Sequence, residues 1–313
     1  MKDTVVIVSK VLPVILLIIL GNVFRKSRFI RQSTIDELKK IIVNISLPAL
    51  LFMAFAGTSF EGRYGLIFLS VFLVCGLMLL LGTIFKSFLN SNNRYLPSLF
   101  SGFETGMMGY SLFVAVYGAA NMYKLALIDL GQVTFVFFIL VTYLQKINGK
   151  SSTINQIVLS FLKSPVILAI LSGILVGSLG LLDAVEAYPL SNSILETLKL
   201  LSNLTVPVIC VVIGYELHID PQNLGRPLLT ALIRVLLLLG IAFLISELLI
   251  ERIMHLDHTF KIALYTMFLL PPPFVIPIFM EAQEVENKRF ILNTISIHIV
   301  LSLAAFLVLI LVM

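Results

Sequence analysis

The feature that most constrains this chain is a series of long apolar runs separated by short charged or turn-forming stretches. A membrane-crossing helix needs about 20 apolar residues, or about 30 with its connection, so the length of the chain predicts about ten spans. Lipid cannot hydrogen-bond exposed backbone, so each run is predicted to be helical and the protein to be all-α and polytopic. The runs lie at 4–24, 36–57, 64–89, 95–118, 124–146, 163–182, 192–215, 227–250, 260–281 and 289–313.

The amino-acid composition excludes most soluble classes of protein. The chain has 59% apolar and 12% charged residues, whereas soluble domains have about 45–50% and about 25%. Because too few charged groups remain to cover a water-exposed surface, a cytosolic enzyme, a nucleic-acid-binding module and a disordered protein are all excluded. The predicted surroundings are the lipid bilayer of the cell membrane, with no nucleic acid as a partner.

The positions of lysine and arginine predict the orientation of the chain. Of the 22 basic residues, 14 lie in or beside the connections after odd-numbered runs and 7 lie on the other side, while Arg234 lies within a run. Cytoplasmic loops are enriched in Lys and Arg, so the odd connections are predicted to be inside and both termini outside.

Two pairs of segments indicate an internal repeat. Residues 13–21 and 165–173 are both aliphatic stretches that begin with Pro and end with Gly. Residues 44–48 and 203–207 both place Asn, a hydroxyl residue and Pro at the same spacing. The pattern predicts two five-helix repeats, 1–147 and 160–313, and an odd helix count inverts one relative to the other. Inverted repeats are typical of secondary transporters; the alternative is coincidence in an apolar chain.

The fourth and ninth runs contain residues that interrupt helices. Gly102, Gly106 and Gly109 permit an unwound segment in the fourth run. Residues 271–273 are three prolines, which cannot continue a helix and which disfavour helical geometry in the preceding residue. Both interruptions are predicted near the middle of the membrane, where transporters place their substrate sites. The alternatives are a helix-packing face of small residues in the fourth run and a kink without function in the ninth.

Interrupted helices in an inverted pair predict the charge of the ligand. The second halves of both helices would point their N-terminal N–H groups at one place, which suits an anion. The carbonyl ends of the first halves would suit a cation or a protonated carboxyl. We therefore expect an anionic substrate, with Na⁺ or H⁺ as a coupling ion and no other cofactor.

Polar residues within the apolar runs are the candidate site residues, because ionisable groups are costly in a membrane and usually functional. Glu104 could carry a proton or bind a cation; alternatively, it holds the interruption by accepting backbone hydrogen bonds. For the others, the alternatives are hydrogen bonds between helices, packing around a Pro kink and, for the histidine, a satisfied structural group. The candidates for ion or proton coupling are Glu104, Asp129, Gln132 and His298. The candidates for substrate binding are Asn44, Ser46, Thr105, Gly106, Gly109, Ser111, Asn203, Thr205, Pro273, Phe274, Pro277 and Asn293.

Arg234 is predicted to reach the cytoplasmic edge of the membrane with its long side chain. The alternative is that it is the only fixed cation available to a substrate carboxylate. No catalytic or phosphate-binding motif is present, so the protein is not expected to be an enzyme, and ATP cannot be the energy source within this chain.

Three motifs together resemble the auxin efflux carrier family, particularly its bacterial malate- and malonate-permease-like members. They are the Asn-Ile-Ser-Leu-Pro-Ala-Leu-Leu-Phe sequence at 44–52 after a basic loop, the Gly-Met-Met-Gly-Tyr-Ser-Leu sequence at 106–112, and the proline-rich ninth run. The resemblance implies ten transmembrane helices as two inverted five-helix repeats, with broken helices four and nine crossing. It also implies a scaffold of 4–57 and 163–215, often dimeric, and a mobile transport part of 64–146 and 227–313.

The resemblance implies a secondary active transporter of a small organic anion that works by alternating access. The chain departs from the family at two positions, where members often have Asn near Glu104 and Pro at Ser111. A carboxylate in place of an amide conflicts with a simple anion site unless Glu104 is protonated or paired with a cation. Two other functions remain open: a sodium-coupled, bile-acid-like organic anion symporter, and a membrane receptor or sensor on a transporter-like core.

Overall fold

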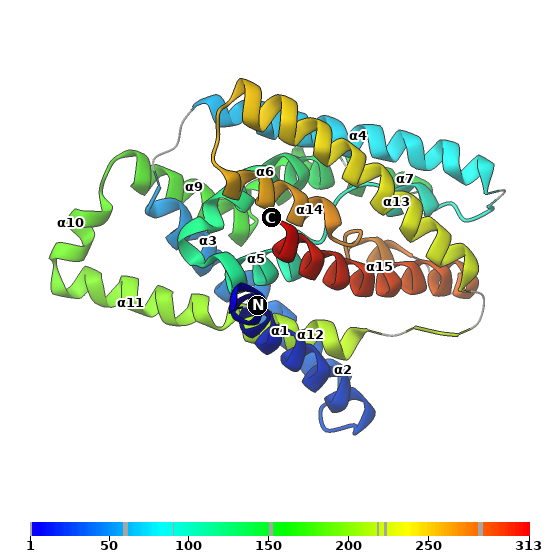
Figure 1. The fold of residues 1–313 in the computed structure, drawn as a ribbon, viewed down its shortest axis with the longest axis horizontal. Helices are drawn as coiled ribbons and strands as arrows, with labels where there is room; N and C mark the ends of the chain where they lie inside the picture. The colour runs from blue at the N-terminus through cyan, green and yellow to red at the C-terminus, as the bar shows by residue number, and fades with distance from the viewer. Residues whose placement is uncertain are drawn as a thin grey trace. The chain divides into compact units, whose positions relative to one another are not determined.

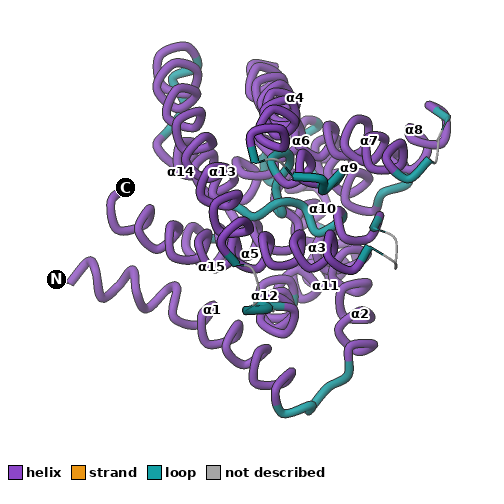
Figure 2. The backbone as a smooth tube through the Cα atoms, turned by 90° about the vertical axis from the view of Figure 1, so that its right-hand side faces the viewer, coloured by secondary structure: helices purple, strands orange, loops and turns teal. Residues whose placement is uncertain are grey.

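The computed structural model describes residues 2–58, 62–89, 91–149, 153–217, 219–221, 224–280 and 284–313. Within these ranges all regular secondary structure is helical, with no strand (Figure 2). The elements are α1 (Lys2–Lys26), α2 (Gln32–Ile41), η1 (Ile42–Ser46), α3 (Leu47–Ala56), η2 (Gly62–Tyr64), α4 (Gly65–Phe88), η3 (Leu96–Leu99), η4 (Thr105–Gly109), α5 (Tyr110–Tyr117), η5 (Ala119–Asn121), α6 (Met122–Phe135), η6 (Val136–Leu140), α7 (Val141–Ile147), α8 (Ile154–Leu162), α9 (Pro165–Ser178), α10 (Leu182–Ala187), α11 (Pro189–Asn203), α12 (Thr205–Glu216), α13 (Gly225–Leu244), η7 (Ile245–Ile253), α14 (His258–Leu269), η8 (Ile276–Phe279) and α15 (Val285–Val312).

Six helical stretches of the described chain are long and apolar enough to cross a membrane. A seventh is present if α8 and α9, which meet at 61°, form one bent span. The predicted class, an all-helical multi-pass membrane protein, is confirmed. Of the other predicted spans, 4–24 coincides with α1, while 95–118 and 260–281 are interrupted, so neither contains a continuous helix of membrane-crossing length. The six stretches are Gln32–Ala56, Gly65–Phe88, Ala119–Ile147, Pro189–Glu216, Gly225–Ile253 and Val285–Val312.

The chain forms two compact units, and each unit takes segments from both predicted repeats. Unit 1 comprises Met1–Tyr64, Gly106–Ala126 and Ser160–Leu217. Unit 2 comprises Gly65–Thr105, Leu127–Leu159 and His218–Met313.

Two helix pairs make the most extensive contacts of unit 1: α1 with α12, and α3 with α9 (Figure 1). Glycines allow these close approaches. The backbone of α1 at Ile18 lies against Gly214 of α12 so closely that a Cβ there would overlap the Ile18 carbonyl. Gly21 meets the Val211 carbonyl in the same way, and a Cβ on Gly173 of α9 would lie 2.8 Å from the Phe52 carbonyl oxygen of α3.

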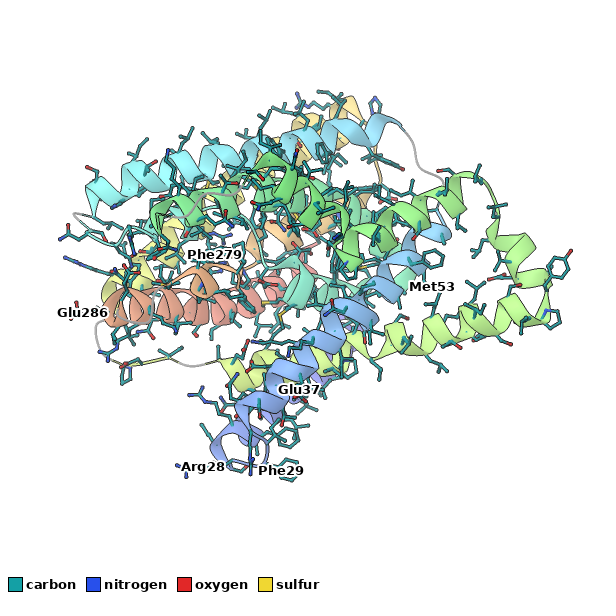
Figure 3. The ribbon with its side chains drawn as sticks, turned by 180° about the vertical axis from the view of Figure 1, so that it is seen from behind. Arg28, Phe29, Glu37, Met53, Phe279 and Glu286 are labelled. Carbon is teal, nitrogen blue, oxygen red and sulfur yellow. The ribbon has the colours of Figure 1, made fainter. Side chains whose placement is uncertain are left out.

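The basic first loop of unit 1 is an exposed turn between α1 and α2. Figure 3 labels Arg28 and Phe29 at this turn, where Arg28 has a φ of 55°. The same end of the unit is tied to α12, because Arg25 donates to the Leu217 carbonyl at 2.9 Å and Lys39 forms an ion pair with Glu216.

Unit 2 is built on α13, α14 and α15, which contact one another pairwise (Figure 1). Its α4 packs against η3, where a Cβ on Gly82 would lie 2.7 Å from the Pro97 carbonyl oxygen. The opposite face of α4 leaves a row of aliphatic side chains exposed at helical spacing, as a lipid-facing helix would. This row contains Leu66, Leu69, Leu73, Leu77, Leu80 and Ile84.

An ion pair holds the start of α15 in unit 2. The Nε of Arg94 lies 3.0 Å from Oε1 of Glu284, and the Arg94 guanidinium also donates to the Ile147 carbonyl at 2.9 Å. Burial raises the pKa of Glu284, but hydrogen bonding from Tyr95 and Arg94 and the Arg94 charge lower it more. The net pKa therefore lies below its ordinary value of 4.5.

Glu284→Gln is expected to lower the stability of the protein by about 1 kcal/mol or less, since the pair is partly exposed. A lowered folded-state pKa makes the stabilisation full above the unfolded pKa and removes it as pH falls through the folded pKa. Thermal unfolding in detergent should therefore separate the wild type from Glu284→Gln at neutral pH and bring the two together in acid. A difference that persists at the lowest pH would contradict this account.

Candidate functional site

The two predicted interruptions are present, and they lie against each other in unit 2. After η3 the chain is non-helical through Glu104, and Gly102 has a φ of 73°. A Cβ on Gly102 would lie 2.7 Å from Cγ of Pro273, so both the backbone angle and the space require glycine. Helix α14 ends at Leu269, before the prolines. Across the two interruptions, the Glu104 N–H donates to the Pro271 carbonyl at 2.9 Å.

The Glu104 side chain joins the same two segments. Its Oε2 accepts a hydrogen bond from the backbone N–H of Phe274 at 2.6 Å. Because prolines have no N–H, Phe274 carries the first backbone donor after the triple proline. This geometry is the one expected of a carboxylate that holds the interruption. The role of Glu104 in carrying a proton or cation stays a prediction.

Arg234 lies at the centre of this arrangement with 1% of its surface exposed. Its NH2 donates to the Gly102 carbonyl at 2.6 Å, and its NH1 donates to the Leu270 carbonyl at 2.7 Å. The prediction that Arg234 reaches the membrane edge is therefore wrong. The Leu270 carbonyl follows the end of α14 and the Gly102 carbonyl lies in non-helical chain, so neither has an intrahelical partner and both solvate the guanidinium inside the protein. We call Gly102, Glu104, Arg234, Leu270 and Phe274 the break cluster.

His298 of α15 is fully buried beside the break cluster, with its Nε2 2.8 Å from NH1 of Arg234. A guanidinium only donates hydrogen bonds, so Nε2 must accept and the ring proton lies on Nδ1. Nδ1 is 3.1 Å from Oγ of Ser302, which in turn donates to the Leu269 carbonyl at 2.5 Å. His298 thus has the contacts of a neutral structural histidine, and its coupling role stays a prediction.

The other polar candidates of unit 2 are buried and form separate contacts. Nε2 of Gln132 donates to Oδ1 of Asp129 at 2.9 Å, while Oε1 of Gln132 has no hydrogen-bond partner in the described residues. The amide of Asn293 accepts from the Asp220 N–H at 2.9 Å and donates to the Asp220 carbonyl at 3.0 Å. Asn293 therefore anchors the segment before α13, as the alternative of structural hydrogen bonding expects.

The candidate residues of unit 1 are of two kinds: exposed asparagines and buried residues that carry a hydroxyl group. Asn44 and Asn203 are exposed, and the Asn44 amide donates to the Lys40 carbonyl of its own helix at 2.8 Å. Among the candidate residues, buried hydroxyls without a hydrogen-bond partner in the described residues belong to Ser46, Ser111 and Thr205 of unit 1 and to Thr105 of unit 2. A buried polar group that makes no hydrogen bond costs about 1–3 kcal/mol. The buried hydroxyls are therefore stronger candidates for binding a ligand than the exposed asparagines. Gly106 and Gly109 lie in η4, which begins at Thr105 and is followed two residues later by Ser111.

The second half of the ninth span differs from the prediction. After the prolines only η8 forms, a single 3-10 turn that contains Pro277 and ends at Phe279 (Figure 3). A turn this short has no substantial dipole, so the expected pair of converging helix N-termini is not formed by the described residues. Positive charge is instead supplied to the break cluster by Arg234. An arginine within an apolar run is costly, and that cost was the sequence signal for its role.

A multi-pass helical chain whose interrupted helices enclose a buried charge has the character of a membrane transporter. A family model described as "Membrane transport protein" matches residues 6–312. The chain therefore belongs to this family, the auxin efflux carrier family whose motifs it resembles. Membership of a transport family favours a carrier over an enzyme. No curated protein matches the chain.

Proposed function

We propose that this protein is a secondary active transporter that moves a small organic anion across the cell membrane by alternating access. The class of substrate is a mono- or dicarboxylate, such as malate or malonate. The observation that carries the proposal is the buried guanidinium of Arg234 at two helix interruptions, in a chain that belongs to a family of transport proteins.

The charge balance around Arg234 favours an anion. Among the described residues its side chain forms no ion pair, and its Nε–H has no hydrogen-bond acceptor. Its direct hydrogen-bond partners are two carbonyl dipoles and a neutral histidine, so no ion pair among these contacts neutralises the charge, while the Glu104 carboxylate of the same cluster is engaged by the Phe274 N–H. Carboxylates match the donor geometry of a guanidinium, whereas a cation would be repelled.

Two features of unit 1 support the inverted repeat, which is typical of carriers that work by alternating access. Under the proposed repeat, the first and second spans correspond to the sixth and seventh. The contact of α1 with α12 then corresponds to the contact of α9 with α3, and these are the two largest contacts of the unit. The glycines that end the matching Pro-to-Gly stretches, Gly21 and Gly173, both lie against a carbonyl of the facing helix. We propose that 4–57 and 163–215, which lie in unit 1, supply the scaffold, through which a homodimer would form, and that 64–146 and 227–313 supply the mobile part, of which Gly106–Ala126 also belongs to unit 1.

Counterflow in proteoliposomes tests the proposed function. Vesicles loaded with unlabelled malate, malonate or succinate are expected to accumulate the labelled form of the same acid, with the membrane potential and pH gradient clamped. The neutral diamides of these acids serve as matched controls and should not exchange. Exchange of cations alone would contradict the proposal. Saturable binding without exchange would favour a receptor or sensor, and exchange confined to large amphipathic anions would favour a bile-acid-like symporter.

A further inference from the structure

The carbonyl oxygens at the two interruptions would ordinarily be the place for a coupling cation. In secondary transporters, unwound backbone carbonyls and the C-terminal ends of half-helices coordinate Na⁺. Here the Leu270 carbonyl, at the C-terminal end of α14, and the Gly102 carbonyl, in the non-helical chain after η3, both accept hydrogen bonds from Arg234, at 2.7 and 2.6 Å. The donor comes from α13, 132 and 36 residues away from these carbonyls in sequence.

We propose that the Arg234 guanidinium is a tethered cation that takes the place of a coupling Na⁺ at the break cluster. The consequence is that transport, if the proposed function is right, proceeds without Na⁺. The protein carries its compensating positive charge permanently and does not bind and release it in each cycle.

The surroundings of Arg234 suit a permanent cation and exclude a second one. One carbonyl partner of the guanidinium is Leu270, at the C-terminal end of α14, where the helix dipole places partial negative charge, and the other is the non-helical Gly102. The Phe103 ring lies under it with 5.3 Å between the guanidinium carbon and the ring centroid, and Phe103 stacks on Phe268 at 5.1 Å. A Na⁺ ion at the same carbonyls would lie within a few ångströms of the guanidinium, and repulsion in a low-dielectric site would expel it.

A permanent charge also follows from the chemistry of the side chain. Arginine does not lose its proton in proteins, so the tethered cation cannot be removed by a change in pH. The neighbouring His298 accepts from the guanidinium through Nε2, and Ser302 holds its other nitrogen. Protonation of His298 at Nε2 would break this contact and place two positive charges together, so the same arrangement keeps the histidine neutral.

The first test uses the wild-type protein in NaCl, KCl and choline chloride at equal ionic strength. Counterflow and the thermal unfolding temperature in detergent are both measured. We expect counterflow to agree within about twofold in the three salts, and no rise in unfolding temperature specific to Na⁺. A requirement for Na⁺, or a saturable stabilisation by Na⁺, would overturn the proposal. If no organic anion exchanges in any salt, the proposed function fails, while the unfolding temperatures still decide on the tethered cation.

The second test removes the charge with Arg234→Gln and uses Arg226→Gln as the matched control, since Arg226 is an exposed residue of the same helix. Arg234→Gln is expected to lose about tenfold or more of its exchange in choline, and Na⁺ should then raise its unfolding temperature selectively. Arg226→Gln should behave as the wild type. Wild-type exchange by Arg234→Gln would contradict the proposal. If Arg234→Gln does not unfold cooperatively, Arg234→Lys is used in its place, and we expect it to exchange the anion without Na⁺. A requirement for Na⁺ in Arg234→Lys would also contradict the tethered cation.

Discussion

Replacing Gly214 by alanine is expected to destabilise the protein by about 3 kcal/mol or more, at the upper end of overpacking effects. The added Cβ would overlap the backbone carbonyl of Ile18, and a backbone atom cannot rotate away as a flexible side chain can. Helices α1 and α12 would therefore have to separate along the largest contact of unit 1. Thermal or denaturant unfolding in detergent measures the loss.

Gly240→Ala is the matched control for this substitution. Gly240 lies within α13 and has no neighbouring atom within 4 Å of the position of an added Cβ. Alanine there should be neutral or should stabilise the helix by up to about 1 kcal/mol. If Gly214→Ala unfolds at the same temperature as Gly240→Ala, the close approach of α1 and α12 is not a feature of the folded protein.

Glu104→Ala is expected to reduce exchange by about ten- to a hundredfold, because it removes a charge-assisted hydrogen bond of about 1.5–3 kcal/mol between the interruptions. The Phe274 N–H would lose the carboxylate that accepts it at 2.6 Å, and the register of the two segments depends on that contact. Glu104→Gln keeps an acceptor at this position. It should therefore retain most of the exchange if the residue acts by holding the segments together.

The variants Glu104→Ala and Glu104→Gln also distinguish a structural role of Glu104, which joins the two interruptions, from a role in ion or proton coupling. If Glu104 carries a proton or binds a cation, Glu104→Gln should abolish the pH or ion dependence of transport, even though its hydrogen bond is kept. Glu247→Gln controls for the loss of a carboxylate elsewhere in unit 2, since Glu247 forms a partly exposed ion pair with Lys261 at 3.3 Å. An alanine variant of Glu104 with wild-type exchange would remove the residue from the site altogether.

Much of the fold could be predicted because it depends on local properties of the chain. Runs of apolar residues must be helical in lipid, and three successive prolines must end a helix wherever they lie. The interruption at Gly102 follows from the same kind of local rule, since glycine readily adopts the positive φ that it has here. The matching Pro-to-Gly stretches predicted a repeat, and only the structure places the glycine at the end of each stretch at a helix contact.

The chemistry of the candidate site was less predictable. Its interactions join residues that are 36 to 170 positions apart, as in the contacts of Arg234 with Leu270 and of Phe274 with Glu104. The prediction for Arg234 was wrong because a long side chain can reach either a membrane edge or an internal acceptor, and only packing decides which is nearer. Asn293 shows the same limit, since its amide anchors the Asp220 backbone.

The amino-acid sequence by itself determined that this protein is a helical membrane protein of a transport family, with helices interrupted at Gly102 and at the triple proline. These properties follow from hydrophobicity and backbone stereochemistry, which act over a few residues. Only the tertiary structure decided which groups meet at the interruptions, and that they enclose an arginine whose charge is solvated by two carbonyls. Hydrogen bonds and charge compensation depend on distances of about 3 Å in space, and separation along the chain does not set those distances.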